Sequence, residues 1–326
     1  MSIREFLRFS AHLQLLPVLE SGEETLVGGQ AVMEGVMMRA PHSYCVAVRK
    51  ADGEIITEQS PLPRVSEKYP IFKLPVLRGL GTLGQAMTLG FKALRFSANT
   101  ALEAHRPAEH EGKEMPGWIM WLNLICSVLF FLILYKVVPL YIATELGNAV
   151  SFLHSRLAIN IADGVIRLGL FLAFITLISR MKDIHRVFEY HGAEHKVVFN
   201  FESGQEVNVQ NSQTFPTWHP RCGTSFLIVV MLMSLVAYAF LPFDSYVAKL
   251  AARLLLLPLI VGLSYEVIRF AAKRRASVLA TITAPGLWLQ RVTTQPPSDT
   301  QTAVAIHALQ GAMALEAEQG GELVIA

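Results

Sequence analysis

Four long apolar runs constrain the fold of this chain more than any other feature of its sequence. The first, 118–142, contains a single charged side chain, Lys136, and is long enough to cross a hydrocarbon core of about 30 Å, which takes about 20 helical residues. Only 17% of the residues are charged, against roughly 25% in soluble proteins. We therefore predict a mainly α-helical polytopic membrane protein with about four transmembrane helices. The other three runs are 165–178, 224–243 and 250–270. The helix that contains 165–178 is expected to begin near Leu157.

Lysine and arginine residues indicate the side of the membrane on which each connecting segment lies. They are frequent before the first run, after the second and after the fourth, whereas the loops 143–156 and 244–249 hold one cation each, Arg156 and Lys249. Short loops rich in lysine and arginine stay on the cytoplasmic side. The alternation therefore predicts that both termini are cytoplasmic.

Local signals divide the rest of the chain. Asp52–Gly53 lies between two β-type segments, which predicts a hairpin. The apolar, glycine-rich segment 74–99 is interrupted by cations and favours a membrane-surface or re-entrant helix over a fifth span. Ser298 and Gln301 have the spacing of a capping box, which predicts a helix to about Glu318. The predicted parts are an amphipathic segment 1–24, a cytoplasmic glycine-rich and β-hairpin region 25–103, a linker 104–116, a four-span domain 117–275 with a cytoplasmic loop 179–223, and a cytoplasmic tail 276–326.

A histidine-rich motif follows the second run. His191 and His195 are four residues apart, so a helix places both imidazoles on one face, with Glu194 in the same neighbourhood. H-x-x-E-H is the order of the inverted zincins, in which the histidines hold Zn²⁺ and the glutamate polarises its water. We predict His191 and His195 as metal ligands and Glu194 as the catalytic base. The alternative is an interfacial helix whose histidines only form hydrogen bonds.

A second group of ligand-type residues lies where the third run begins. His219 and Cys222 are three residues apart, and both are good ligands for zinc or a related metal. Glu266 lies near the basic end of the fourth run, and an acid within a span is a functional candidate. The predicted topology brings these groups to the same side, so all three are candidate ligands of a divalent metal, zinc by preference. The alternative for Glu266 is a salt bridge to Arg269.

The glycine-rich stretch 28–41 pairs Glu34 with Arg39. Glycines permit a close backbone approach to a ligand, and an arginine can clamp an anionic group. We assign Glu34, Arg39 and also Arg221 to substrate binding, with a tight structural turn as the alternative. Within the second run, Asp163 and Arg167 are expected to form a self-satisfied pair rather than a proton relay.

Composition limits the partners. The net charge of +2 is too mild to indicate a nucleic-acid partner, and three cysteines cannot make a disulfide framework. We expect the lipid bilayer as the main partner and leave a homo-oligomer open.

Three motifs carry a resemblance to a known family. They are Gly-Gly-Gln-Ala-Val-Met-Glu-Gly-Val-Met-Met-Arg at 28–39, Tyr-His-Gly-Ala-Glu-His-Lys at 190–196 and His-Pro-Arg-Cys-Gly-Thr-Ser-Phe at 219–226. With these, and with segments 264–269 and 290–294, the chain resembles the YqhQ-like family over about residues 25–310. That family consists of bacterial membrane proteins of unknown function, often described as metal-dependent enzymes. The resemblance implies residence in the bacterial cytoplasmic (inner) membrane and no established reaction.

Three functions follow from these residues. The first is a metal-dependent membrane enzyme, most plausibly a hydrolase, with His219, Cys222 or Glu266 completing the metal shell. The second is a non-catalytic assembly factor or scaffold, in which His191, His195, His219 and Cys222 close a structural zinc site. The weakest is a transporter, which requires that Asp163, Arg167 and Glu266 line one path.

Overall fold

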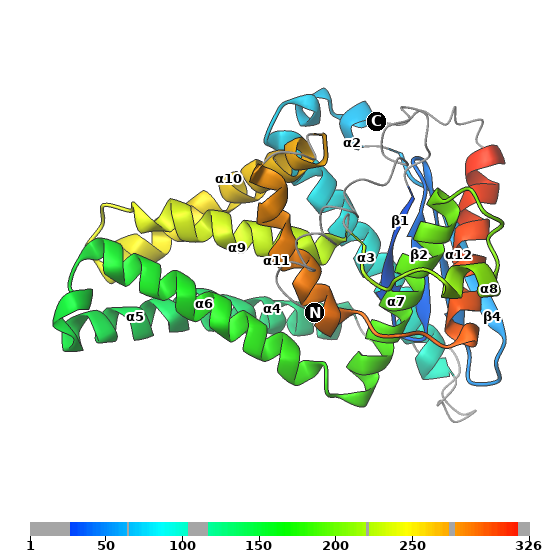
Figure 1. Cartoon of the computed structure of the whole chain (residues 1–326), viewed down its shortest axis with the longest axis horizontal. Coiled ribbons are helices and arrows are strands. Elements are labelled where there is room, and N and C mark those ends of the chain that lie inside the picture. The colour runs from blue at the N-terminus through cyan, green and yellow to red at the C-terminus, as the bar shows by residue number, and fades with distance from the viewer. Residues whose placement is uncertain (1–26, 64, 104–116, 220–221, 274–277, 319–326) are drawn as a thin grey trace.

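The computed structural model describes residues 27–63, 65–103, 117–219, 222–273 and 278–318. The predicted segments 1–24 and 104–116, and Arg221, lie outside these residues. The described chain has two parts, a bundle of long apolar helices and a sheet covered by helices (Figure 1). One long helix, α3 (Leu77–Glu103), contacts both parts.

The sheet has four antiparallel strands in the order β1-β2-β3-β4. The predicted hairpin around Asp52–Gly53 is confirmed, because β3 and β4 pair from Arg49↔Ile55 to Ser43↔Pro61. The glycine-rich stretch, which we assigned to substrate binding with a tight turn as the alternative, forms a second hairpin with a tight turn at Met33 and Glu34. Its turn places Glu34 at φ 53°, which a non-glycine residue rarely adopts. The strands are β1 (Gly28–Val32), β2 (Gly35–Arg39), β3 (Ser43–Arg49) and β4 (Ile55–Pro61).

Helices cover both faces of this sheet. Successive side chains of a strand point to opposite faces, and on β2 Val36 and Met38 pack against α7 (Lys182–Glu202) and α12 (Asp299–Glu318), whereas Met37 joins a cluster with α3. The sheet is therefore the middle layer of three. Segments that we predicted as a loop and a tail thus supply helices to this core.

The C-terminal helix α12 is held at both ends. The predicted capping box is confirmed, since the Ser298 amide donates to Gln301 Oε1 at 2.8 Å and the Gln301 amide donates to Ser298 Oγ at 3.3 Å. Near its other end, the buried Glu316 carboxylate contacts His42 Nδ1 at 2.9 Å and accepts from Ser43 Oγ at 2.8 Å. These contacts hold the C-terminal end of α12 on the sheet.

The bundle contains three helices that are long and apolar enough to cross a membrane, 122–149, 156–178 and 246–270, which make the chain a multi-pass membrane protein. The fourth predicted span is the shorter apolar helix α9, of 17 residues. Helix α3 is not among the candidate spans. The elements are α4 (Gly117–Leu132), the π-helical η4 (Ile133–Val137), α5 (Val138–Ala149), α6 (Arg156–Ile178), α9 (Gly223–Ala239) and α10 (Tyr246–Lys273).

A buried polar network joins the spans. Asp163 and Arg167 of α6 form the predicted ion pair, and Arg253 of α10 contacts the same carboxylate, with its Nη1 2.9 Å from Asp163 Oδ1. Arg253 also donates to Asn160 Oδ1 at 2.9 Å, and Arg167 donates to Ser234 Oγ of α9 at 3.1 Å. The pair is therefore one part of a network that links three helices.

Short elements complete the fold and bring the chain to the site. Helix α11 (Val278–Thr293) packs on α9 so closely that a Cβ added to Gly286 would lie 2.5 Å from Ser225 Cα. The segment after α11 crosses α7, where the Gln295 amide donates to the Phe188 carbonyl at 2.9 Å. The remaining elements are α2 (Val65–Lys68), η2 (Pro70–Lys73), η5 (Ser151–Leu153) and α8 (Val209–Gln213).

Candidate metal centre

Helix α7 carries the histidine motif without interruption. His191, Glu194 and His195 lie on one face, and the centroids of the two imidazole rings are 4.4 Å apart. Gly192 does not break the helix. A Cβ at this position would meet the Gln295 carbonyl oxygen at 2.0 Å, so glycine is required for the close approach of the segment after α11.

Cys222 reaches the histidines from the start of α9. It is the N-cap residue of that helix, and its Sγ lies 3.2 Å from His191 Nε2. The Thr224 amide and hydroxyl lie 3.5 and 3.2 Å from the same sulfur. Cysteine binds metals through its sulfur as the thiolate, so Cys222 presents a ligand-type atom to the histidines.

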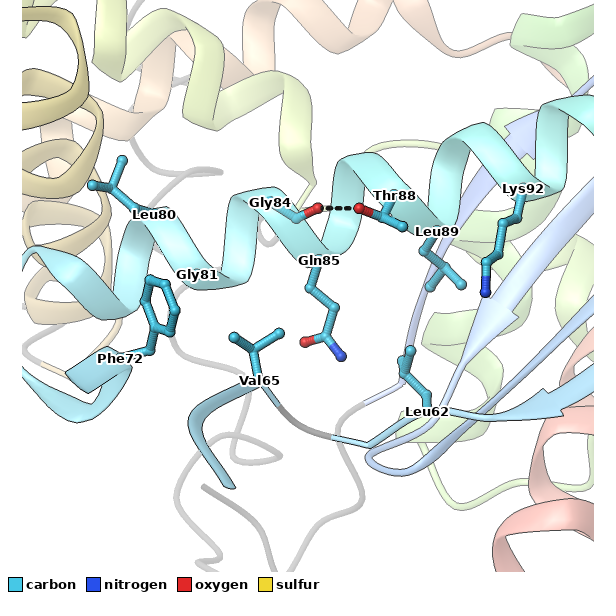
Figure 2. Close-up of a pocket in the computed structure, with 10 residues that line it drawn as sticks. All are labelled: Leu62, Val65, Phe72, Leu80, Gly81, Gly84, Gln85, Thr88, Leu89 and Lys92. Carbon is cyan, nitrogen blue, oxygen red and sulfur yellow. Dashed lines mark hydrogen bonds between the residues drawn. The ribbon is translucent and has the colours of Figure 1, made fainter. Parts of the chain in front are cut away.

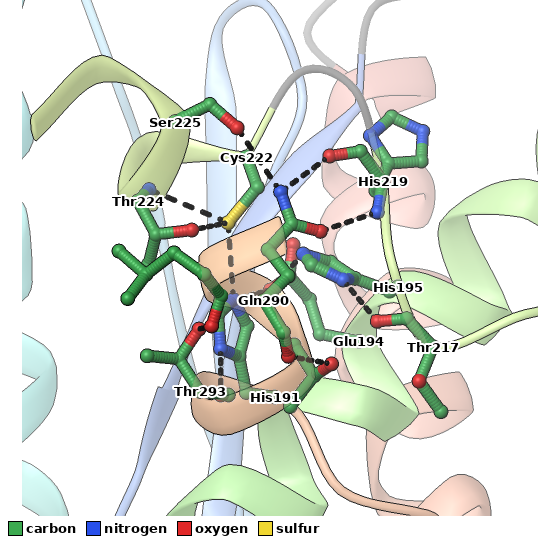
Figure 3. A network of polar contacts seen from close by, with 12 residues as sticks. His191, Glu194, His195, Thr217, His219, Cys222, Thr224, Ser225, Gln290 and Thr293 are labelled. Atoms are coloured by element: carbon green, nitrogen blue, oxygen red, sulfur yellow. Dashed lines mark hydrogen bonds and ion pairs between the residues drawn. The ribbon is translucent and has the colours of Figure 1, made fainter. Parts of the chain in front are cut away.

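Backbone carbonyls orient both imidazole rings (Figure 3). His191 Nδ1 lies 2.7 Å from the Thr293 carbonyl oxygen, and His195 Nδ1 lies 2.6 Å from that of Thr217. Because a carbonyl oxygen can only accept, each Nδ1 carries a proton, and in the neutral ring Nε2 is then the nitrogen with the free lone pair. Metal-binding histidines are commonly held this way. Burial also favours the neutral ring, because it lowers the pKa of His195 to about 4.

The geometry and the donor types together fit a metal ion. One potential ligand atom from each of His191, His195 and Cys222 lies within 4.8 Å of the others. Zinc bonds of about 2.0–2.1 Å to imidazole nitrogen and about 2.3 Å to thiolate need such spacing. Two imidazoles and a thiolate suit zinc or a related divalent ion better than magnesium or calcium, which prefer oxygen ligands.

Glu194 lies beside this group. One of its carboxylate oxygens is 3.8 Å from His191 Nε2 and 4.0 Å from His195 Nε2. Burial raises the pKa of Glu194, an effect opposed by the nearby histidines and by a hydrogen bond from the Gly29 amide. A Cβ on Gly29 would lie 2.8 Å from Glu194 Cγ, so β1 supplies a wall of the site that a larger residue would fill.

His219 is close by but faces another partner. Its Nε2 lies 3.4 Å from Glu202 Oε2, and its ring centroid lies 5.7 Å from that of His195. The ring is buried, which lowers its pKa to about 4. Gln290 fixes its backbone at both ends, accepting from the His219 amide at 2.7 Å and donating to the His219 carbonyl at 2.9 Å. Of the four predicted ligands, the structure thus brings His191, His195 and Cys222 together. A role for His219 as a ligand stays a prediction.

Glu266 is not brought to this group. Arg78 of α3 contacts both of its carboxylate oxygens, with Nε 2.6 Å from Oε1, and the Val76 amide donates to Oε1 at 3.2 Å. The reason is that the part of α10 that carries Glu266 packs against α3, whereas the histidines lie on α7. A salt bridge was the alternative for Glu266, but its partner is Arg78 rather than Arg269. Asp163 and Arg167 belong to the separate network of the spans, and the transporter path has no support in these contacts.

The predicted substrate-binding residues are also dispersed. Glu34 contacts Arg186 of α7 through both carboxylate oxygens, one at 2.7 Å, and accepts from the Tyr190 hydroxyl at 3.2 Å. Arg39 is the last residue of β2, at the opposite end of that strand from Glu34. The pairing of Glu34 with Arg39 was therefore wrong, because the stretch between them is an extended strand and not a turn. Their role in substrate binding, like that of Arg221, stays a prediction.

Sequence reasoning missed several residues that shape the site. Thr217 and Thr293 act through carbonyl groups, which every residue has, so their side chains give no signal. Gln290 and Thr293 lie within the segment 290–294 that also resembles the YqhQ-like family, and that resemblance is the signal that points to them. Gly29 was noted for close approach to a ligand, whereas its neighbour is Glu194.

Comparisons with known proteins agree on a family without an assigned function. The family model described as "Protein of unknown function (DUF1385)" matches residues 74–315. The chain is 34% identical over 298 residues to "Uncharacterized protein YqhQ" of Bacillus subtilis (strain 168), which covers 89% of this chain and 93% of that protein. No solved structure matches the chain. The chain therefore belongs to the DUF1385 family, whose function is unknown.

Proposed function

We propose that this protein is a metal-dependent membrane enzyme of hydrolase type, with its site at the cytoplasmic face of the membrane. The observation that carries the proposal is the convergence of His191, His195 and Cys222, whose ligand atoms lie within 4.8 Å of one another. Catalytic zinc sites use three protein ligands and leave a fourth position open, whereas structural sites close with four.

The chain's own residues suit such a reaction. His191 and His195 would bind the metal through Nε2, because each Nδ1 is held by a carbonyl oxygen. A divalent ion here would supply a Lewis acid. Glu194 is placed to take a proton from a nucleophile, and burial raises its pKa toward the range of a general base. The buried setting strengthens each of these electrostatic interactions.

A structural zinc site is the second candidate, and one observation favours it. The three ligands and the carbonyl groups that orient them come from α7, α9, α11 and the segment before α9, so a metal would fasten the spans to the helices of the sheet. His219 or Glu194 would complete the shell. The protein would then act as a scaffold or assembly factor.

Metal analysis of the purified full chain tests both candidates. We expect about one equivalent of zinc in the wild type, because three converging ligand atoms make a specific site, and its loss in His191→Ala. His185→Ala is the matched control, since His185 lies on the same helix but is 47% exposed and faces Glu189. Absence of metal from the wild type would contradict both candidates.

A second measurement separates the candidates. For an enzyme, Glu194→Gln should keep the metal and lose hydrolysis of chromogenic esters and phosphoesters that the wild type cleaves. For a structural site, the zinc-loaded wild type should cleave none of these, and Cys222→Ser should lower the melting temperature. The same unfolding temperature for wild type and Cys222→Ser, with zinc bound, would exclude the structural role.

A further inference from the structure

A groove of about 400 Å³ runs along α3, beside the segment that leads from the sheet to this helix (Figure 2). Its walls are mainly apolar and include Leu62, Val65, Phe72, Leu80 and Leu89. Gly84 forms part of the α3 side, and a Cβ added there would meet no atom within 4 Å. The groove is therefore open where a side chain would otherwise stand.

The polar groups of the groove are satisfied internally, with one exception. Gln85 Nε2 donates to the Pro63 carbonyl at 2.9 Å, and Thr88 Oγ1 donates to the Gly84 carbonyl at 2.9 Å. Lys92 stands at one end, and within the described residues it forms no hydrogen bond or ion pair. Within the part of the chain that the structure describes, the groove is thus lined by apolar side chains and has the unpaired cation Lys92 at one end.

The other end of the groove lies beside a candidate membrane span. Arg78, two residues before Leu80, pairs with Glu266, near the end of the candidate span 246–270. In contrast, Leu89 joins the core cluster of the sheet. Leu80 and Lys92 are about 18 Å apart along the helix, at 1.5 Å per residue. The groove therefore leads from the bilayer level toward the sheet, with its cation at the sheet end (Figures 1 and 2).

Exposed apolar side chains lie beside the membrane end. Tyr69, Ile71 and Leu74, in and around η2, are 51%, 57% and 55% exposed, and Lys68 and Lys73 flank them. Apolar and aromatic residues flanked by lysines are typical of segments that insert into the membrane interface. An insertion here would place the mouth of the groove among lipid chains.

We propose that the groove binds a long-chain fatty-acid anion from the adjacent leaflet, with its carboxylate at Lys92 and its chain directed toward Phe72 and Leu80. The apolar walls match the chain, the ammonium group matches the carboxylate, and the direction matches that of a lipid entering from the bilayer. The volume lies within the range of single-ligand pockets and suits one chain. This site is independent of the metal centre.

Photolabelling of the full chain in liposomes tests the proposal. The probe is palmitate with a diazirine on its chain, and we expect the label on peptides from residues 62–92. Gly84→Trp should reduce this labelling by about tenfold or more, because the indole would occupy the volume of the ligand. Gly169→Trp in α6 is the matched control, since its added Cβ also meets no atom within 4 Å.

The charge of the ligand is tested with the methyl ester of the same probe. The wild type should prefer the acid, and Lys92→Gln should remove that preference while still accepting the ester. Equal labelling of Gly84→Trp and wild type, or labelling of the spans alone, would overturn the proposal. Protection by phosphatidylglycerol but not by palmitate would overturn the choice of a single-chain ligand, and absence of label from the full chain would overturn the site.

Discussion

Two buried polar clusters among the described residues, the ion-pair network of the spans and the candidate metal centre, differ in the atoms that face one another. In the spans, the Asp163 carboxylate contacts the guanidinium groups of Arg167 and Arg253. In the metal centre, two imidazoles turn Nε2 toward a thiol, and no cationic side chain lies among the three ligands. In the spans the buried carboxylate faces two guanidinium groups, whereas in the metal centre the potential ligand atoms face one another.

This difference separates a role in stability from a role in binding. Removing one partner of a buried ion pair leaves an uncompensated charge and is strongly destabilising. The three candidate ligands form no ion pair with one another, so removing one of them breaks no such pair, but it lowers the affinity for a cation. We therefore expect substitutions in the spans to act on folding and substitutions in the metal centre to act on metal content.

The largest expected effect is that of Asp163→Asn. It leaves Arg167 and Arg253 without their carboxylate, which should cost about 3–5 kcal/mol of unfolding free energy and appear as a large drop in melting temperature in detergent. Asp244→Asn is the control, because Asp244 pairs with Arg156 at 71% exposure and should cost less than about 1 kcal/mol. Equal effects of the two changes would mean that the network does not stabilise the bundle.

The next effect is a loss of stability in acid when a chelator keeps metal away. The pKa of His195 and of His219 is lowered from 6.5 to about 4 in the folded protein, so between these values the unfolded chain binds more protons. Stability should be at its full value above pH 6.5 and fall as the pH approaches 4. His219→Gln should weaken this dependence, and His307→Gln, an exposed change on α12, should not. A flat profile for the wild type would show that these rings are not buried.

A smaller effect is expected from the glycine that touches Glu194. In Gly29→Ala the new Cβ would lie 2.6 Å from the Met37 carbonyl oxygen and 2.8 Å from Glu194 Cγ, so overpacking should cost about 1–3 kcal/mol. Gly28→Ala, where nothing lies within 4 Å, should change stability by less than about 0.5 kcal/mol. Chemical denaturation measures both free energies of unfolding. Similar midpoints for the two variants would show that β1 is not packed closely against Glu194.

The smallest effect concerns the group beside the sulfur. Thr224→Val removes a hydroxyl 3.2 Å from Cys222 Sγ and should weaken zinc binding by about tenfold, as changes in outer-shell partners do. The control is Thr176→Val, whose hydroxyl donates to the Leu172 carbonyl of its own helix. Competition with a zinc-sensitive dye measures both affinities, and an unchanged value for Thr224→Val would mean that the thiolate needs no help from this hydroxyl.

Local patterns predicted much of the fold. The apolar runs located the long helices, Asp52–Gly53 located a hairpin, and Ser298 with Gln301 located the start of α12. The glycine-rich stretch was harder to interpret, because glycines at close approaches and glycines at turns look alike in a sequence. Coverage of the sheet by α12 depends on contacts between residues more than 250 positions apart, such as Ser43 with Glu316, which no local pattern shows.

The same limit applies to the site. Helical spacing placed His191, Glu194 and His195 together, and topology added Cys222. We predicted Glu266 as a metal ligand from its depth in the membrane. Depth does not determine which neighbouring helix an acid contacts, and Glu266 contacts Arg78 of α3. Side chains such as Gln290, which fix the loop around His219, act on backbone groups and have no spacing rule of their own.

X-ray absorption spectroscopy of the zinc-loaded full chain tests the central claim most directly, because it reports the atoms bound to the metal. We expect one sulfur at about 2.3 Å and two imidazole nitrogens at about 2.0–2.1 Å, with the sulfur lost in Cys222→Ser and one imidazole lost in His191→Ala. A shell made of oxygen alone, or one that neither substitution changes, would contradict it.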